Sequence, residues 1–366
     1  MALVTRLTSP RHGSPARQQL ARTYSDPNAD AVTVGKLFHV AHLVEDLAPL
    51  DAWYDKVFAP VRGVMDGQFA ASEQRMASLL VIGDAVIEAM SPSSEPAAAT
   101  MPIGRFLTKF GRHWHSVAWF CDDIRSIWDQ MVGAGIGVSR ASGHRDGTPL
   151  EGDIYSHPRD TFTQLEFYQP PVSRGGPHGP GPFKDPRFEP GWSARWKASP
   201  NPLGIERLAY VSIVVPDLEL AKEVYCGGIG AIHLGDAIST STGTCSAYVS
   251  VGPETVLELA QPTEPGGLAG TDLATHGGMC HAVAFTVTDL EQVTDHLGRV
   301  GISVLDRDDT TILADPDDTF GAPFRFTTWR APGDPRDQAG ATSITTAPPM
   351  PPPAHIAATP IPPPRR

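Results

Sequence analysis

Histidines and glutamates recur at matching places along the sequence, each inside a short segment of mostly apolar residues. Three predicted strands contain a histidine at or near their start: His39, His115 and His281. In three later segments a glutamate stands four residues before a proline: Glu88, Glu166 and Glu258. Imidazoles and carboxylates transfer protons near neutral pH and bind divalent cations. These residues are therefore the first candidates for acid–base or metal chemistry.

Four stretches of the chain share one plan that would position these residues. Each opens with a predicted strand, passes through an acidic residue and a leucine or isoleucine into a helix, and returns through three strands. In the first stretch, Leu37–Val44 alternates as a strand with His39 on its apolar face. Asp46 takes the helix N-cap position, and helical spacing follows as far as Phe58. The repeat predicts an α+β protein of four βαβββ modules in two domains.

Composition narrows the classes of partner. The 366 residues carry a formal charge of −12, so we expect no basic stripe for a nucleic acid. No apolar run approaches the ~20 residues that span a bilayer, and we expect no membrane partner. Four scattered cysteines without a CxxC pair are typical of reduced thiols in a cytoplasmic protein. A small-molecule substrate is the expected partner, and the oligomeric state stays open.

Clusters of proline and glycine divide the chain. Their composition favours solvated tails and linkers over packed structure. The predicted division is a disordered N-terminal tail, a first domain, a linker, a second domain and a disordered proline-rich tail, at residues 1–33, 34–170, 171–204, 205–331 and 332–366. Within the linker, Trp192 and Trp196 are expected to pack onto one of the domains.

The repeated plan resembles the vicinal oxygen chelate superfamily, which includes glyoxalase I, methylmalonyl-CoA epimerase, bleomycin-binding proteins and extradiol dioxygenases. The resemblance covers about residues 36–170 and 205–330. It implies two glyoxalase-like domains in which paired modules form a cup around one metal, with ligands from the first and last strands. Carried onto this sequence, the metal ligands would be His39, Glu88, His115 and Glu166, the His–Glu–His–Glu set of bacterial glyoxalase I.

The chemistry of these residue types supports that ligand set. Four ionisable groups converging in a half-buried cup would cost several kcal/mol per ion without a partner, and a divalent cation would offset this cost. Nitrogen and oxygen donors without thiolate suit Ni²⁺, Co²⁺, Fe²⁺, Mn²⁺ or Zn²⁺. We therefore expect one divalent metal in the first domain. The resemblance further implies that Glu166, or Glu88, acts as the general base.

The position of His115 leaves one ligand open. Counted back from the acidic residue that begins the helix, His115 stands one residue farther than His39 does. Strict alternation would then put Ser116 in the cup. His281 shows the same offset in the second domain, which favours a shared bulge that restores His115 to the cup and turns Ser116 away. His113 is the alternative ligand.

The second domain has lost most of the set. Tyr210 replaces the first histidine, and either Phe324 or Arg325 replaces the last glutamate. Glu258 could pair with Arg325. We expect this domain to be a scaffold or to shape the substrate site.

The favoured hypothesis is a metal-dependent lyase, isomerase or epimerase that removes a proton from a small oxygenated substrate. His157 and Arg159 are weaker candidates for substrate contact, because their segment resembles the epimerase branch of the superfamily. An extradiol-type dioxygenase is the alternative enzyme, although its two-histidine, one-carboxylate site leaves no role for Glu88. A drug- or metabolite-binding protein without catalysis is the third possibility. The sequence does not identify the substrate.

Overall fold

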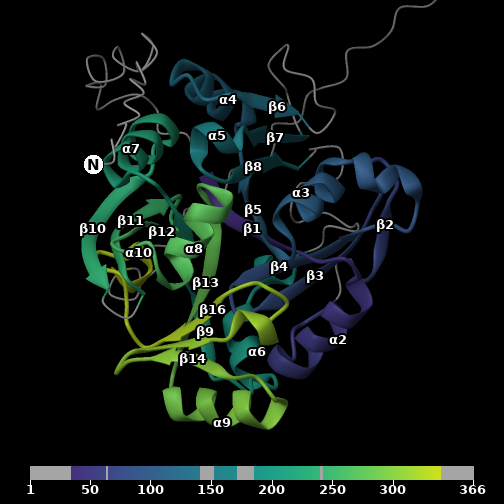
Figure 1. Cartoon of the computed structure of the whole chain (residues 1–366), viewed down its shortest axis with the longest axis vertical. Coiled ribbons are helices and arrows are strands. Elements are labelled where there is room, and N and C mark those ends of the chain that lie inside the picture. The colour runs from purple at the N-terminus through teal and green to yellow at the C-terminus, as the bar shows by residue number, and fades with distance from the viewer. Residues whose placement is uncertain (1–33, 63–64, 141–151, 171–184, 240–241, 339–366) are drawn as a thin grey trace, which may run out of the picture.

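The computed structural model describes residues 34–62, 65–140, 152–170, 185–239 and 242–338. Within these ranges the strands form two eight-stranded sheets, one in each half of the chain, with helices packed against them (Figure 1). This is the predicted α+β architecture of four modules in two domains. The predicted tail at 1–33, most of the C-terminal tail (339–366) and the first part of the predicted linker (171–184) lie outside the described residues.

The first domain contains two modules joined by a short helical segment. The first module consists of β1 (Val34–Leu43), α2 (Leu47–Phe58), β2 (Gln68–Ala70), β3 (Arg75–Ile82) and β4 (Ala85–Pro92). The connection consists of the 3-10 turn η1 (Pro96–Thr100) and α3 (Pro102–Phe110). The second module consists of β5 (His113–Cys121), α4 (Ile124–Gly133), β6 (Val138–Arg140), β7 (Gly152–Ser156), α5 (Pro158–Thr161) and β8 (Gln164–Gln169).

The second domain repeats this arrangement. Its first module consists of β9 (Ile205–Val214), α7 (Leu218–Lys222), the π-helical turn η5 (Glu223–Ile229), β10 (Ile232–Ser239), β11 (Thr244–Val251) and β12 (Thr255–Pro262). The connecting helix is α8 (Gly267–His276). Its second module consists of β13 (Met279–Val287), α9 (Leu290–Val300), β14 (Val304–Arg307), β15 (Thr311–Ala314), the 3-10 turn η6 (Pro316–Asp318) and β16 (Phe324–Thr327).

The acidic residues of the repeated openings begin the module helices, as predicted. Each side chain accepts a hydrogen bond from a backbone N–H of the first helical turn, which otherwise has no partner in the helix. These N-cap residues are Asp46, Asp123, Asp217 and Asp289.

The first strands of paired modules lie next to each other in each sheet. In the first domain β1 runs parallel to β4 and antiparallel to β5, and the strand order is β2-β3-β4-β1-β5-β8-β7-β6. The second sheet has the equivalent order, β10-β11-β12-β9-β13-β16-β15-β14. Residues on β1, β4, β5 and β8 can therefore meet over the middle of the first sheet.

One hydrophobic core joins the two domains. The ring of Phe58, at the end of α2, packs against Phe324 of β16 with ring centroids 5.3 Å apart. The Trp114 indole donates a hydrogen bond to the Pro323 carbonyl over 3.0 Å. Because these groups are buried, the domains are packed on each other through a core and not only through a surface contact.

The described part of the predicted linker is folded, which differs from the prediction. Residues 185–204 contain the 3-10 turn η4 (Pro186–Phe188) and α6 (Trp192–Ala198). The Trp192 indole donates to the Gly83 carbonyl of the first domain, and the buried Trp196 indole donates to Ile205 of the second. Composition suggested a linker because the anchoring side chains are few among many prolines and glycines.

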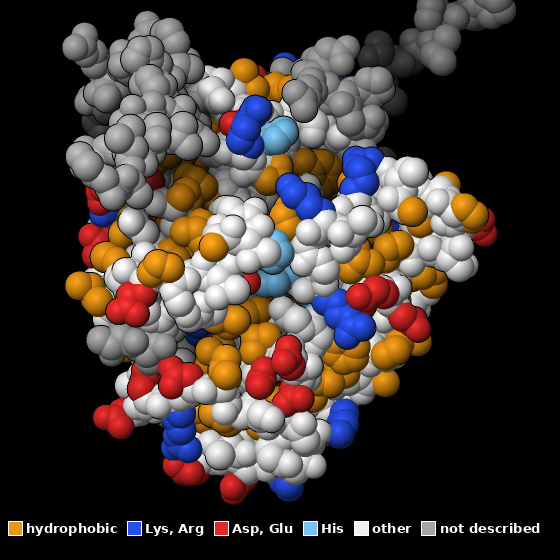
Figure 2. Space-filling view, viewed as in Figure 1, with side chains coloured by type: hydrophobic (Ala, Val, Ile, Leu, Met, Phe, Trp, Pro, Cys, Tyr) orange, Lys and Arg blue, Asp and Glu red, His pale blue; other side chains and the backbone are white. Residues whose placement is uncertain are grey.

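The second domain likewise extends beyond its predicted end at 331. Helix α10 (Pro335–Gln338) follows β16, and Asp334 just before it is buried. On the face shown in Figure 2, acidic and basic side chains of the described residues are interspersed and apolar side chains lie between them. None of the helices in the described ranges has the length and apolar character that crossing a membrane would require.

Candidate functional site

Two bulges turn additional side chains toward one face of the first sheet. Strand β1 has an extra residue at Phe38 relative to β5, and β5 has an extra residue near His115 relative to β1. Phe38 and His39 consequently face the same cavity, as do His115 and Ser116. The predicted bulge in β5 is therefore present. Ser116, which we expected to face away, also lines the cavity because the bulge places two consecutive side chains on one face.

Strand register brings His39 between two carboxylates. His39 pairs with Ala118 of β5, and Ala118 pairs with Glu166 of β8. The small alanine leaves room above the sheet, and His39 Nε2 lies 3.5 Å from Glu166 Oε2. On the other side of β1, Glu88 of β4 pairs with Ala41, and its Oε2 lies 3.2 Å from the same nitrogen. All three ionisable side chains are buried.

These residues line a cavity of about 330 Å³, which we call the first-domain cavity. The size is that of a site for a small organic molecule. The Phe38 and Tyr168 rings stack at one side, with centroids 5.4 Å apart and planes 23° apart. Apolar side chains also contribute, namely Met65, Leu79, Met90, Pro102 and Ile103. The cavity thus combines a set of acid–base groups with an aromatic wall.

Arg75 of β3 is a functional candidate that sequence analysis missed. Its guanidinium pairs with Glu88 Oε1 and with Glu73, and both Arg75 and Glu88 are largely buried. Glu88 therefore offers one oxygen to Arg75 and the other to His39. The signal available in the sequence is alternation, which puts Arg75 on the same strand face as Ala77 and Leu79. In the sheet, Ala77 and Leu79 pair with Met90 and Glu88 of β4.

The two glutamates have opposite pKa shifts. Burial disfavours the charge of Glu88, but Arg75 and His39 outweigh it and lower the pKa of this carboxyl. Burial raises the pKa of Glu166 more than its hydrogen bond to His39 lowers it, and the nearby charges of Glu88 and Asp153 raise it further. Such divergence separates an ionised carboxylate from one that readily takes up a proton.

The two histidines of the cavity also differ. Burial lowers the pKa of His39, but Glu88 and Glu166 together outweigh burial and raise it. Burial lowers the pKa of His115 to about 4, since Arg75 and His39 partly cancel the attraction of Glu88. His115 is therefore neutral at pH 7, the form in which imidazole binds a metal. Its Nδ1 lies 3.0 Å from Ser116 Oγ.

The nitrogen and oxygen donors of this cavity suit a divalent cation, and two of the distances between them fit a shared ion. Ligand atoms about 2.1 Å from a common ion lie roughly 3.0–3.5 Å from one another, which matches the distances from His39 Nε2 to the two carboxylates. Among the described residues, however, no group of three or more His, Cys, Asp or Glu side chains is arranged to hold a metal ion. The four predicted ligands thus share a cavity without forming a complete coordination shell.

Three other predicted residues lie elsewhere. His113, the alternative ligand, contacts Asp272 of α8 across the domain interface, with 3.2 Å between Nε2 and Oδ2. His157 is the N-cap of α5 and accepts a hydrogen bond from the Arg159 backbone. The Arg159 side chain is 77% exposed and pairs with Asp160. None of the three is among the residues that line the first-domain cavity.

In the second domain an arginine occupies the centre of the equivalent face. Ala284 pairs with both Tyr210 and Arg325, as Ala118 pairs with His39 and Glu166, so Arg325 and not Phe324 replaces the last glutamate. Arg325 donates to Glu258 Oε2 over 2.7 Å, and both side chains are buried. The pair anticipated between them is present. The buried ion pair supplies the positive charge that a cation would otherwise bring.

The fold and sequence have known counterparts. Residues 210–318 match the family model described as the Glyoxalase/Bleomycin resistance protein/Dioxygenase superfamily. A triple mutant of 4-hydroxymandelate synthase from Streptomyces coelicolor is similar over 84% of this chain and 96% of its own, with a TM-score of 0.55 and 14% identity. This chain has the vicinal oxygen chelate fold. Both glyoxalase-like domains share it, as the resemblance implied.

Methylmalonyl-CoA epimerase from Mycobacterium tuberculosis is also similar, over 39% of this chain and 97% of its own, with a TM-score of 0.34 and 21% identity. No protein of curated function matches the sequence. At these identities the vicinal oxygen chelate fold is what the comparisons establish, and the activity has to be argued from the site.

Proposed function

We propose that the first domain is a metal-dependent lyase, isomerase or epimerase that removes a proton from a small oxygenated substrate. One observation carries the proposal: His39 Nε2 lies between Glu88 and Glu166, whose pKa values are shifted in opposite directions. A carboxylate whose charged form is stabilised and a carboxylate that readily accepts a proton are the two groups such a reaction needs.

The residues take different roles in this proposal. Glu88, held ionised by Arg75, and His39 provide negative charge and a nitrogen donor for a divalent cation. His115 is neutral and lies in the same cavity as a further donor. Glu166 has the raised pKa and the less compensated charge, so it is the general base that receives the substrate proton. A bound divalent cation would supply positive charge where negative charge develops on a substrate oxygen.

The cavity suits a small substrate with a planar or apolar part. The stacked Phe38 and Tyr168 rings offer a surface for that part, and the buried carboxylates and imidazoles lie beside it. Burial excludes water from the carboxylates, and this strengthens their interactions with a developing charge. The second carboxylate distinguishes the set from the two-histidine, one-carboxylate site of an extradiol dioxygenase.

The structure also motivates a competing function, ligand binding without a metal. Arg75 already neutralises Glu88, and in the second domain Arg325 neutralises Glu258 in full. If Arg75 likewise replaces a cation in the first domain, the cavity would bind a small molecule without catalysis.

Metal analysis of the purified chain separates the two functions. We expect about one divalent metal per chain after exposure to Ni²⁺, Co²⁺, Mn²⁺, Fe²⁺ or Zn²⁺ and removal of excess by gel filtration. His39→Ala should lose it, whereas Glu258→Gln, a change at the second-domain counterpart of Glu88, should keep it. A wild-type chain that retains none of these metals, or a His39→Ala variant that retains as much as wild type, would contradict the metal enzyme.

A further inference from the structure

The sequence Asp-Pro-Arg occurs twice, once after the last strand of each domain. The first turn is Asp185–Arg187 and the second is Asp334–Arg336. In each turn the aspartate accepts a hydrogen bond from the backbone N–H of the arginine, over 2.9 and 3.0 Å. The same carboxylate accepts from the arginine Nε, over 3.0 and 2.9 Å. The two turns therefore fix an arginine side chain in the same way.

The two arginines bind equivalent backbone carbonyls. Arg187 donates to Leu37 over 2.7 Å, to Phe38 over 3.4 Å and to the Asp84 carbonyl over 2.7 Å. In the second domain Arg336 donates over 2.7, 2.8 and 3.2 Å to the carbonyls of Leu208, Ala209 and Glu254. Each guanidinium thus joins the start of the first strand of its domain to a hairpin turn between two later strands.

The carbonyls of the first strand lie at the bulges. Strand β1 has its extra residue between Leu37 and His39, and β9 has an extra residue between Leu208 and Tyr210. A bulge interrupts the strand ladder and leaves backbone groups unpaired. Pairing with β4 begins only at Val40 and does not reach these carbonyls. In Arg187 one nitrogen, Nη2, donates to both carbonyls of the bulge, and Nη1 donates to the Asp84 carbonyl. The planar guanidinium holds these donors in a fixed geometry, so it joins the bulge to the hairpin turn.

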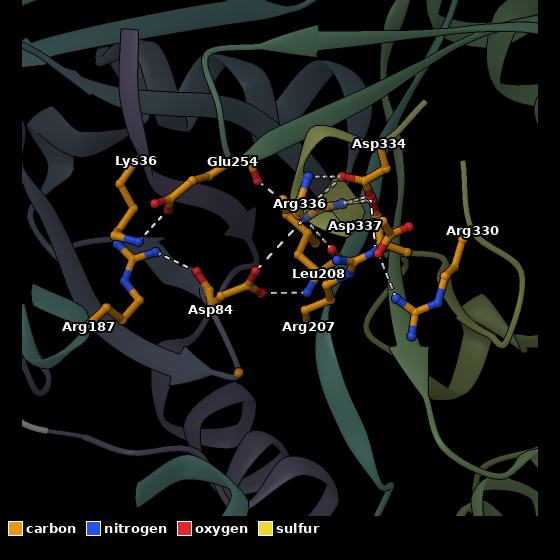
Figure 3. A network of polar contacts seen from close by, with 12 residues as sticks. Lys36, Asp84, Arg187, Arg207, Leu208, Glu254, Arg330, Asp334, Arg336 and Asp337 are labelled. Carbon is orange, nitrogen blue, oxygen red and sulfur yellow. Dashed lines mark hydrogen bonds and ion pairs between the residues drawn. The ribbon is translucent and has the colours of Figure 1, made fainter. Parts of the chain in front are cut away.

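The Arg187 side chain is only 1% exposed, and the charge of Asp185 compensates it. Figure 3 shows Arg187 and Arg336 reaching Asp84 from opposite sides. Asp84 accepts from the Leu208 backbone over 2.6 Å, and Lys36 pairs with Glu254 across the same interface. The bulge of β1 is therefore held by its own turn, next to contacts that join the domains.

We infer that Arg187 is a positioning residue for the first-domain cavity. By fixing the bulge of β1, it holds Phe38 and His39 on the cavity side, with their ring centroids 4.6 Å apart. This orders the aromatic wall and the imidazole that lies between the two carboxylates. Arg336 performs the same local task in the second domain, where Ala209 and Tyr210 take the equivalent places. The metal readout of this inference rests on the proposed function.

The test compares Arg187→Lys with the matched variant Arg336→Lys in the full chain. Lysine keeps the charge, but it lacks the planar set of donors that joins the bulge carbonyls to the hairpin turn. Arg187→Lys should weaken Co²⁺ binding about 10–100-fold, as the loss of groups that orient metal ligands typically does. It should also speed backbone amide exchange at Phe38–Val40. Arg336→Lys should speed exchange at Ala209–Val211 and leave the Co²⁺ affinity within about twofold of wild type.

Equal losses of Co²⁺ affinity in both variants, or unchanged affinity in Arg187→Lys, would overturn the inference. If wild type binds no Co²⁺, the proposed function fails. The positioning role of Arg187 is then tested by amide exchange at Phe38–Val40 and by the NMR resonances of the His39 ring, without the metal. Unchanged exchange and unchanged His39 resonances in Arg187→Lys would then refute it. Should Arg187→Lys not fold, Asp185→Asn loosens the same guanidinium and is compared with Asp334→Asn by the same readouts.

Discussion

At the scale of single residues, the site depends on two glutamates that the sequence presents as equivalents. Both lie four residues before a proline on a last strand, yet only Glu88 has an arginine partner in the described structure. Their pKa values therefore move in opposite directions. The charge of Glu88 is favoured by folding, whereas the charge of Glu166 is opposed by it.

This difference predicts opposite effects of neutral substitutions on stability. Glu88→Gln leaves the largely buried Arg75 charge with Glu73 as its remaining ion-pair partner among the described residues. We expect a loss of roughly 3 kcal/mol in the free energy of unfolding at pH 7. Glu166→Gln removes a charge that burial disfavours, so stability should stay the same or rise by up to about 1 kcal/mol. Urea unfolding without added metal measures both. Equal losses in the two variants would show that the glutamates are not distinguished.

The two histidines of β5 can be tested in the same manner. His115 lines the cavity, whereas His113 contacts Asp272 at the domain interface. Co²⁺ titration of His115→Ala should show affinity lowered by about tenfold or more, and His113→Ala should bind as wild type does. His113→Ala should instead lower stability, because the buried Asp272 loses one of its two histidine partners and keeps His281. Tight binding that survives in His115→Ala and is lost in His113→Ala would assign the ligand the other way.

At the scale of elements, short sequence patterns predicted the features that depend on neighbouring residues in the chain, such as helix starts and strand faces. The aspartates that cap the module helices and the alternation around His39 are local, and the fold and the bulge near His115 followed from their repetition. Arg75 and Arg187 were not predicted. Arg75 acts across a strand pair, and the second domain has Thr244 at the equivalent position opposite Pro262. Arg187 lies in a segment whose composition resembles a linker.

Strand register predicts that the size of Ala118 is essential to the site. This side chain lies between His39 and Glu166 across three strands, and Ala284 lies in the same way between Tyr210 and Arg325. Ala118→Leu should abolish measurable Co²⁺ binding by filling the space where the two side chains meet. Ala284→Leu should cost a similar 1–3 kcal/mol of stability through overpacking and leave Co²⁺ binding intact. Isothermal titration measures Co²⁺ binding and urea unfolding measures stability. Co²⁺ binding by Ala118→Leu at wild-type affinity would refute the requirement for a small side chain between His39 and Glu166.

At the scale of the whole molecule, the two domains have diverged in their charges and share one core. In the first domain Arg75 of β3 pairs with Glu88 and leaves the middle of the sheet open. In the second domain Arg325 of β16 pairs with Glu258 and fills the middle of the sheet. The shared core was beyond sequence analysis, because the apolar faces of the module helices do not specify which sheet they pack against.

His42 belongs to that shared core and links stability to pH. It is fully buried, its Nε2 donates to the Phe320 carbonyl of the second domain over 3.3 Å, and its Nδ1 accepts from the Tyr54 hydroxyl over 2.8 Å. Burial lowers the pKa of His42 to about 3, from an ordinary value of 6.5. Between these two pH values the unfolded chain binds a proton that the folded chain excludes. Stability contributed by the neutral imidazole is therefore present above pH 6.5 and is lost as the pH falls toward 3.

The free energy of unfolding should consequently fall by up to about 1.4 kcal/mol per pH unit through His42 alone. In His42→Gln the side chain can still donate and accept hydrogen bonds but does not titrate. Between pH 4.5 and 6.0 the free energy of unfolding, measured in urea, should therefore change less steeply with pH than in wild type. The difference in slope should correspond to the uptake of roughly one proton on unfolding, whatever the stability of the variant at pH 7. Identical slopes in the two proteins would mean that the imidazole between the domains becomes protonated without unfolding, and that the interface tolerates its charge.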